Sequence, residues 1–176
     1  MTSSARSTRI HLEKEAHKFS IAHMTVFADG SKERLHGHNY YVSLSVDLKP
    51  QRFDEFLDFN VVKRMVRELC EEWDERVILA ERCPFFSRTG DRAGNESDLD
   101  FILCAKRYVL PIDEVVLLPI DNVTTEGLAG VLADRLETRF RGAGLESRVD
   151  GFEVGVTESH GQSGYVRVNF LADAPG

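Results

Sequence analysis

The chain has 176 residues, of which 42% are hydrophobic and 29% are charged. A chain of this length can bury one good core, so a single globular domain is expected. The formal net charge of −7 argues against non-specific binding to nucleic acid or acidic membranes, because no cluster of lysine or arginine offsets the carboxylates. We expect small molecules or further copies of the chain as partners, with no nucleic acid and no membrane.

Cysteine usage and hydropathy indicate a reducing compartment. Cys70, Cys83 and Cys104 are widely spaced and form no Cys-x-x-Cys pair, so neither a disulfide framework nor a cysteine zinc site is predicted. The first nine residues are polar, and no run of eighteen apolar residues occurs. We therefore expect a soluble, cytoplasmic protein.

Two strand patterns open the chain. Residues 10–26 have the character of a strand with an interruption at 14–16, and a cleaner strand follows at 40–49. The apolar set of this second strand is Val42, Leu44, Val46 and Leu48. Polar residues alternate with it, as expected when one face of a strand is buried, and Pro50 ends the pattern.

Helical spacing replaces the strand pattern from Asn60 onward. The apolar residues of this segment are Val61, Val62, Met65, Val66, Leu69, Cys70 and Trp73. A second helix is predicted from the N-cap candidates Thr124 and Thr125 to the glycines at 142 and 144.

Two alternating segments, 152–157 and 165–170, close the chain as strands. The order β-β-α-insert-α-β-β predicts an α+β fold with two helices on one face of an antiparallel sheet.

Three histidines carry the main functional indication. His36 and His38 lie two residues apart, so on a strand their side chains leave the same face, and Gly37 between them allows close approach. His23 ends an apolar, strand-like run thirteen residues before His36. Three neutral imidazoles suit zinc, and three ligands leave a position open, as in catalytic zinc sites. The alternative is that the His-x-His pair is a surface coincidence.

Several further motifs accompany the histidines between Lys18 and Phe170. They are Phe-x-x-Ala-His at 19–23, Leu-His-Gly-His-Asn-Tyr at 35–40, Leu-Asp-Phe at 57–59, Asn-x-Thr-Thr-Glu at 122–126 and Thr-Glu at 157–158. Together they resemble the 6-pyruvoyl-tetrahydropterin synthase and 6-carboxy-tetrahydropterin synthase family. The resemblance implies the tunnelling fold, in which subunits close their sheets into an oligomeric barrel with active sites between them. A homo-oligomer, either a trimer or a hexamer, is therefore expected.

The resemblance also implies roles for single residues. Family members bind zinc through three histidines, which here are His23, His36 and His38, and a late glutamate grips the pterin ring edge, which here is Glu158. A carboxylate suits that role because it can accept two parallel N–H bonds from a guanidine-like edge. Glu158 could otherwise be a solvated carboxylate beside a turn.

Two threonines belong to the same implied pocket. Thr124 and Thr125 match positions that line the pterin pocket in the family. Helix capping alone would also explain both residues.

The catalytic cysteine of the family is missing. Synthases of the family carry it shortly before His-Gly-His, where this chain has Lys32 in the bacterial spacing. Glu33 follows, and Glu-x-x-His-Gly-His resembles a branch of the family that uses a glutamate in place of the thiol and cleaves the side chain of dihydroneopterin triphosphate. Either Glu33 moves protons in this way, or residues 32–34 form a solvated charged loop.

The proton relay of the family also differs. Its Asp-His pair after the first helix reads Asp74-Glu75 here, so the aspartate is kept and the histidine is lost. Asp74 is either catalytic or part of an exposed helix end. His160, two residues after Glu158, is a candidate for the missing relay, unless it is an ordinary surface residue of a turn.

Length is a further departure, because about forty residues separate Leu79 from Asn122 where many relatives need far fewer. We expect an insertion at 80–121, with a polar loop at 87–98 and then an extra strand pair that covers the active-site mouth or an oligomer edge.

Together with the three histidines, the resemblance implies a zinc-dependent lyase that acts on a dihydropterin side chain by elimination or retro-aldol cleavage. One alternative is a tunnelling-fold protein that binds zinc and pterin but has lost or changed this chemistry. Another is a structural zinc site in an oligomeric scaffold.

Overall fold

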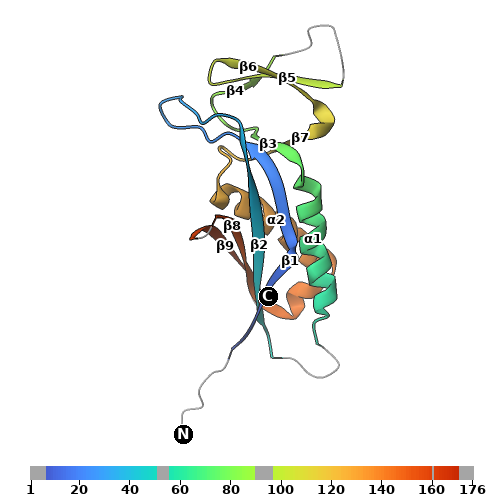
Figure 1. Cartoon of the computed structure of the whole chain (residues 1–176). Coiled ribbons are helices and arrows are strands. Elements are labelled where there is room, and N and C mark those ends of the chain that lie inside the picture. Colours follow the sequence, from blue (N-terminus) through green and yellow to red (C-terminus); the bar gives the residue numbers. More distant parts are fainter. Residues whose placement is uncertain (1–6, 51–55, 90–96, 160, 171–176) are drawn as a thin grey trace, which may run out of the picture.

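The computed structural model describes residues 7–50, 56–89, 97–159 and 161–170. A six-stranded sheet forms the body of the molecule, both helices lie on one face of it, and a small second sheet stands at one end (Figure 1). This is the predicted α+β tunnelling fold.

The main sheet has the strand order β7-β3-β1-β2-β8-β9. Its strands are β1 (Thr8–His23), β2 (His36–Leu48), β3 (Arg76–Ala80), β7 (Val115–Leu118), β8 (Val149–Ser159) and β9 (Gln162–Asn169). The pairs β1–β2, β2–β8 and β8–β9 are antiparallel. The pairs β1–β3 and β3–β7 are parallel, so the sheet is mixed where the sequence predicts an antiparallel one.

The long first strand contains the predicted interruption. The β1–β2 register shifts between Glu13 and Lys18, and beyond that shift Phe19 pairs with Tyr40 and His23 with His36. The apolar parity of β2 therefore continues back to its first residue, which places its histidines on the helix-covered face.

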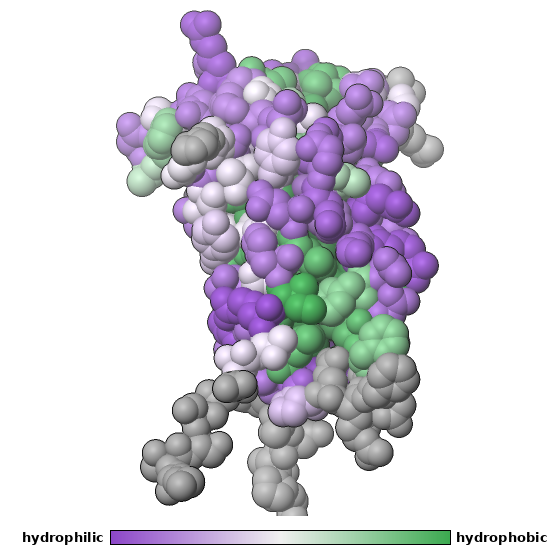
Figure 2. Space-filling view, turned by 60° about the horizontal axis from the view of Figure 1, so that its bottom comes forward, coloured by the Kyte–Doolittle hydropathy of each residue, from purple (hydrophilic) through white to green (hydrophobic). Residues whose placement is uncertain are grey.

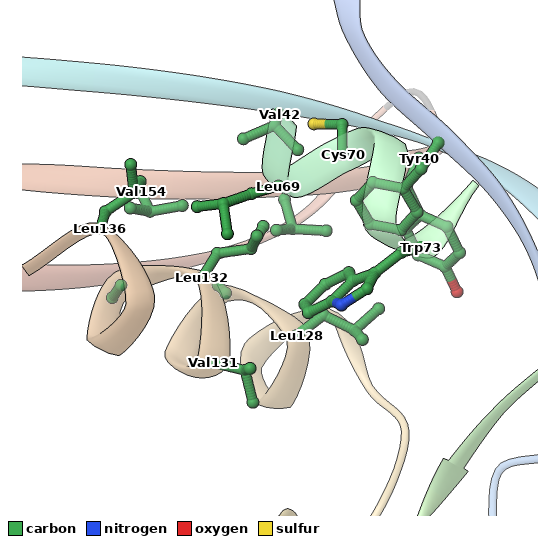
Figure 3. Packing of buried hydrophobic residues seen from close by; sticks show 14 of the residues in the cluster. Tyr40, Val42, Leu69, Cys70, Trp73, Leu128, Val131, Leu132, Leu136 and Val154 are labelled. Atoms are coloured by element: carbon green, nitrogen blue, oxygen red, sulfur yellow. The ribbon is translucent and has the colours of Figure 1, made fainter. Parts of the chain in front are cut away.

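The two helices close that face. Helix α1 (Phe59–Trp73) begins where the Asp58 side chain accepts a hydrogen bond from the Asn60 N–H, and α2 (Thr125–Gly142) begins where the Thr124 hydroxyl accepts one from the Gly127 N–H. Side chains of both helices pack onto β2 and β8 (Figure 3). Trp73 is fully buried and makes a T-shaped ring contact with Phe19, and Phe19 in turn stacks on Tyr40 with 5.3 Å between the ring centroids.

The segment that the sequence predicts as an insertion contains a separate sheet. It consists of β4 (Phe86–Arg88), β5 (Asp98–Leu103) and β6 (Lys106–Pro111), followed by the 3-10 turn η2 (Ile112–Glu114). The sequence predicts a polar loop at 87–98 and then a strand pair, and β5 and β6 form such a pair. Among the described residues β4 is an additional strand, which the sequence did not predict because its three residues are too few to show a period. Another 3-10 turn, η3 (Leu145–Ser147), links α2 to β8.

Figure 2 shows one face, largely hydrophilic, on which hydrophobic residues gather in a strip that runs down toward the grey residues. Among the described residues, no helix is long and apolar enough to cross a membrane.

Candidate functional site

The end of β1 and the start of β2 bring the three predicted histidines together. His23 and His36 are direct partners in the antiparallel register, and His38 lies opposite Ile21. One ring nitrogen from each of His23, His36 and His38 lies within 4.8 Å of the others, a spacing that can hold one metal ion. The donor set fits such an ion, because imidazole nitrogens are common metal ligands.

Neighbouring groups prepare two of the imidazoles for this role. The Nδ1 of His36 lies 2.7 Å from the carbonyl oxygen of Arg34. Because a carbonyl only accepts, Nδ1 donates this hydrogen bond, and in the neutral imidazole the lone pair is then on Nε2. His23 is buried, and this burial lowers its pKa, which favours the neutral imidazole that a metal requires.

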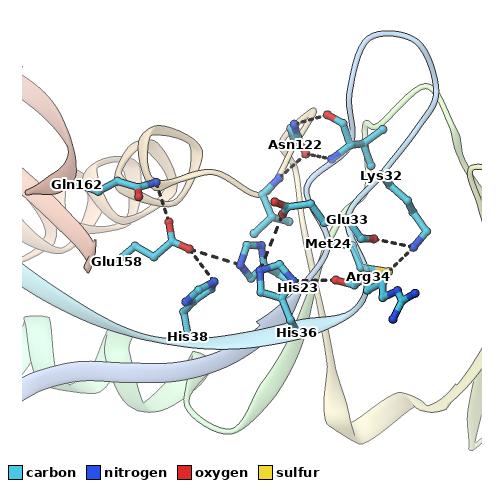
Figure 4. Close-up of polar contacts among 12 residues, drawn as sticks. His23, Met24, Lys32, Glu33, Arg34, His36, His38, Asn122, Glu158 and Gln162 are labelled. Carbon is cyan, nitrogen blue, oxygen red and sulfur yellow. Dashed lines mark hydrogen bonds and ion pairs between the residues drawn. The ribbon is translucent and has the colours of Figure 1, made fainter. Parts of the chain in front are cut away.

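Glu158 approaches the histidines from β8 (Figure 4). Its Oε1 lies 3.0 Å from Nε2 of His38 and 3.9 Å from Nε2 of His23, and its Oε2 accepts a hydrogen bond of 3.0 Å from the Gln162 side chain. Only 15% of the Glu158 side chain is exposed. A half-enclosed carboxylate of this kind can accept hydrogen bonds from a ligand, whereas a freely solvated one would favour water.

Glu33 approaches the cluster from the other side, on the segment between β1 and β2. Its Oε2 lies 3.9 Å from Nε2 of His36. The main-chain N–H of Glu33 donates to the Thr25 carbonyl, and a hydrogen bond from the Thr25 side chain lowers the pKa of the Glu33 carboxyl. The carboxylate is therefore ionised near neutral pH, the form that accepts a proton.

One cavity of about 580 Å³ contains all these groups. Its lining includes His23, His36, His38, Glu33, Glu158, Thr124 and Thr125 from the predicted site, together with Thr25, Tyr40, Glu126, Gln162 and Ser163. No lysine or arginine of the described residues lines it. Of the predicted site residues that the structure describes, it thus brings together all except Asp74.

Asp74 lies elsewhere in its own chain. Its carboxylate accepts a 2.7 Å hydrogen bond from the Ser20 N–H, while the N–H of Glu75 donates to the Ser20 carbonyl. Glu75 borders a separate cavity of about 380 Å³, which Ser20 and His38 also line. His160 lies outside the described residues.

The sequence did not single out several lining residues. Thr25 lies beside Glu33 because of the Val26–Lys32 bridge, and this pairing was not evident in the sequence. The hydroxyl of buried Tyr40 lies 3.1 Å from Nε2 of His23, and only its parity with the histidines could have indicated this.

Glu126 completes the set of cavity carboxylates. It follows the two threonines at the start of α2, where its own main-chain N–H and the threonine hydroxyls lower the pKa of its carboxyl. In the sequence, the position of Glu126 in the Asn-x-Thr-Thr-Glu motif was the feature that could have indicated its place in the cavity.

Comparison with known proteins identifies the family. The family model for 6-pyruvoyl tetrahydropterin synthase matches residues 11–168. The chain belongs to this family. A similar protein is the putative 6-carboxy-5,6,7,8-tetrahydropterin synthase of Methanocaldococcus jannaschii, 33% identical over 154 residues that cover 85% of this chain and 89% of the relative. A protein of the same description from Pyrococcus abyssi is 28% identical over 132 residues, 73% of either chain.

Solved structures agree with this assignment. The 6-pyruvoyltetrahydropterin synthase of Plasmodium vivax superposes with a TM-score of 0.82 at 27% identity, covering 94% of this chain and 99% of that one. A variant of that enzyme, in which a catalytic glutamate is replaced by alanine, gives the same TM-score at 26% identity with the same coverage.

Proposed function

We propose that the protein is a zinc-dependent lyase that cleaves the side chain of a dihydropterin, by elimination or retro-aldol cleavage, with a compound of the dihydroneopterin triphosphate type as substrate. The observation that carries this proposal is the cavity in which Glu33 and Glu158 lie at different histidines of one cluster. Membership of the synthase family supports the substrate class.

Ring binding falls to Glu158 in this proposal. A pterin ring presents two neighbouring N–H donors, and a carboxylate can accept both in parallel. Thr124 and Thr125 line the same cavity, where their polar groups can orient the ring. The Gln162 side chain holds Oε2 of Glu158 at 3.0 Å, which limits the directions in which the carboxylate can point.

Proton transfer falls to Glu33. Zinc suits three imidazole ligands and, when bound by His23, His36 and His38, would polarise the side-chain oxygens of the substrate. Glu33 is ionised and lies 3.9 Å from His36, so it can accept a proton from a substrate hydroxyl held at that place. The catalytic glutamate of the similar Plasmodium vivax enzyme supports this role.

Asp74 and His160 complete the proposed catalytic set. Asp74 does not border the cavity of its own chain, so we assign it to the cavity of a neighbouring copy in a trimer or hexamer. His160 follows Glu158 by two residues and remains our candidate for the proton relay that the family places after Asp74.

A second candidate function is a zinc and pterin-binding protein without lyase chemistry. The absence of the family cysteine and the Glu75 in place of the relay histidine favour it. Incubation of the zinc-loaded protein with dihydroneopterin triphosphate, followed by mass analysis, separates the two. We expect conversion to a product with an eliminated or shortened side chain. Recovery of intact substrate, bound to the protein in proportion to zinc, would establish the second function instead.

A further inference from the structure

Lys32, at the place where the family has its cysteine, is directed away from the cavity. Its ammonium group donates hydrogen bonds to the Glu33 carbonyl at 3.0 Å and to the Met24 sulfur at 3.2 Å, as Figure 4 shows. The same Nζ lies 5.2 Å from the ring centroid of Tyr108, on strand β6 of the insertion. Lys32 therefore joins the segment that carries Glu33 to the inserted sheet.

The core of the insertion fixes the ring of Tyr108. Tyr108 stacks on Phe101 with 5.2 Å between centroids and 14° between planes, and Phe101 is fully buried. Phe86 of β4 also packs on Phe101, with 5.5 Å between the two ring centroids. The Tyr108 ring under Lys32 is thus held in place by its stacking on Phe101, which is packed in turn against Phe86.

The segment between β1 and β2 has a second attachment on its opposite side. The side chain of Asn122 donates to the Val26 carbonyl at 2.8 Å and accepts from the Val26 N–H at 3.0 Å. Val26 pairs with Lys32 in an isolated bridge, and the Glu33 N–H donates to Thr25. Asn122 therefore fixes the part of this segment that contains Val26. The part that contains Glu33 is attached to the inserted sheet through Lys32.

We propose that the insertion positions Glu33: the Tyr108 ring holds the Lys32 ammonium group, which in turn holds the main-chain carbonyl of Glu33. Lys32 and Tyr108 are positioning residues in this arrangement. A cation over an aromatic face, out of full contact with water, keeps a long side chain in one place. The inference rests on the proposed function for its catalytic consequence, because a misplacement of about 1 Å can lower turnover by about 10²-fold.

Four variants test the proposal. Tyr108→Leu removes the aromatic face, Lys32→Met removes the charge and both hydrogen bonds, and Tyr108→Phe keeps the ring. Val109→Ala is the matched control, since Val109 is the next residue of β6 and is half exposed. Hydrogen exchange of residues 25–35 is measured in each zinc-loaded protein, together with kcat and KM for dihydroneopterin triphosphate.

We expect Tyr108→Leu and Lys32→Met to speed exchange in this segment and to lower kcat by about tenfold with little change in KM. The double variant should be no worse than either single variant, because both act through one contact. Tyr108→Phe, which keeps the aromatic ring, should retain the wild-type exchange rate and kcat.

Unchanged exchange in both Tyr108→Leu and Lys32→Met would overturn the proposal, whether or not the protein turns over a pterin. Faster exchange with unchanged kcat would refute the positioning of Glu33. If the wild-type protein lacks turnover while exchange responds as expected, the proposed lyase function fails and the attachment of the segment to the insertion stands.

Discussion

The proposed function assigns metal binding, ring binding and proton transfer to different side chains of the cavity. His23, His36 and His38 present nitrogens within 4.8 Å of one another. Glu158 approaches this cluster from strand β8, and Glu33 approaches it from the segment between β1 and β2. If these assignments are correct, substitutions at the three histidines, at Glu158 and at Glu33 should have separable effects.

Zinc binding is the first role to test. Replacing His36 or His38 by alanine should remove zinc without unfolding the chain, because both side chains are partly exposed at the end of the sheet and contribute little to the core. Metal analysis and circular dichroism check both parts. His11→Ala is the control, since this exposed histidine lies elsewhere on β1. Full zinc occupancy in the double variant would contradict the assignment.

Substitutions of Glu33 and Glu158 should affect different steps, turnover for Glu33 and ring binding for Glu158. Glu33→Gln should lower turnover by about 10²–10⁴-fold with little change in ring binding, as expected on loss of one general acid or base. Glu158→Gln should weaken ring binding first, because an amide oxygen is a poorer acceptor than a carboxylate. Steady-state kinetics with a fluorescence titration of the pterin distinguish the two. Wild-type turnover in Glu33→Gln would show that another group carries the proton.

The secondary-structure elements decide whether these side chains meet. The parity of β2 and the helical spacing from residue 60 were readable in the sequence, and they located the histidines and the covered face. The short parallel strands β3 and β7 could not be predicted from the sequence, because their pairing joins segments on either side of a separate sheet. The contact of Asp74 with Ser20 was equally hidden, since it depends on how α1 ends against β1.

The junction of β9 with α2 should be sensitive to one methyl group. A Cβ at Gly164 would lie 2.7 Å from the Glu126 nitrogen, so Gly164→Ala must displace either the strand or the start of the helix. We expect a loss of about 1–3 kcal/mol in stability and weaker ring binding, measured by urea unfolding and pterin titration. Gly130→Ala is the control, because nothing lies within 4 Å of its added Cβ. Equal behaviour of the two variants would contradict the packing.

Strand β1 should also make stability depend on pH. His17 is buried against α1, and this burial, together with nearby Lys14, Lys63 and Arg67, lowers its pKa from the ordinary 6.5. The unfolded chain therefore binds the proton first as pH falls, so the stability contributed by neutral His17 is complete above pH 6.5 and declines below it.

Urea unfolding at pH 7.5 and at acidic pH, on wild type and His17→Gln, measures this contribution. The loss of stability on acidification should be smaller in the variant. His11→Gln, on the exposed part of the same strand, serves as the control. An identical acid sensitivity in His17→Gln and wild type would exclude His17 as a cause.

At the scale of the whole molecule, the chain is expected to assemble. The sheet ends in the edge strands β7 and β9, and its face opposite the helices exposes Tyr41 and Tyr165. Closure of several such sheets into a barrel would cover this surface, and we predict a trimer or hexamer. Light scattering at micromolar concentration measures the mass. A monomer under these conditions would refute the assembly and with it the placement of Asp74 in a neighbouring cavity.

The proposed zinc-dependent pterin lyase activity depends on the three-histidine cavity. The most direct measurement is turnover of dihydroneopterin triphosphate as zinc is added back to protein stripped with a chelator. Turnover should rise in proportion to bound zinc, reach its limit at one zinc per chain, and be nearly absent at every zinc level in Glu33→Gln. Turnover that is independent of zinc, or no turnover at one zinc per chain, would contradict the proposed function.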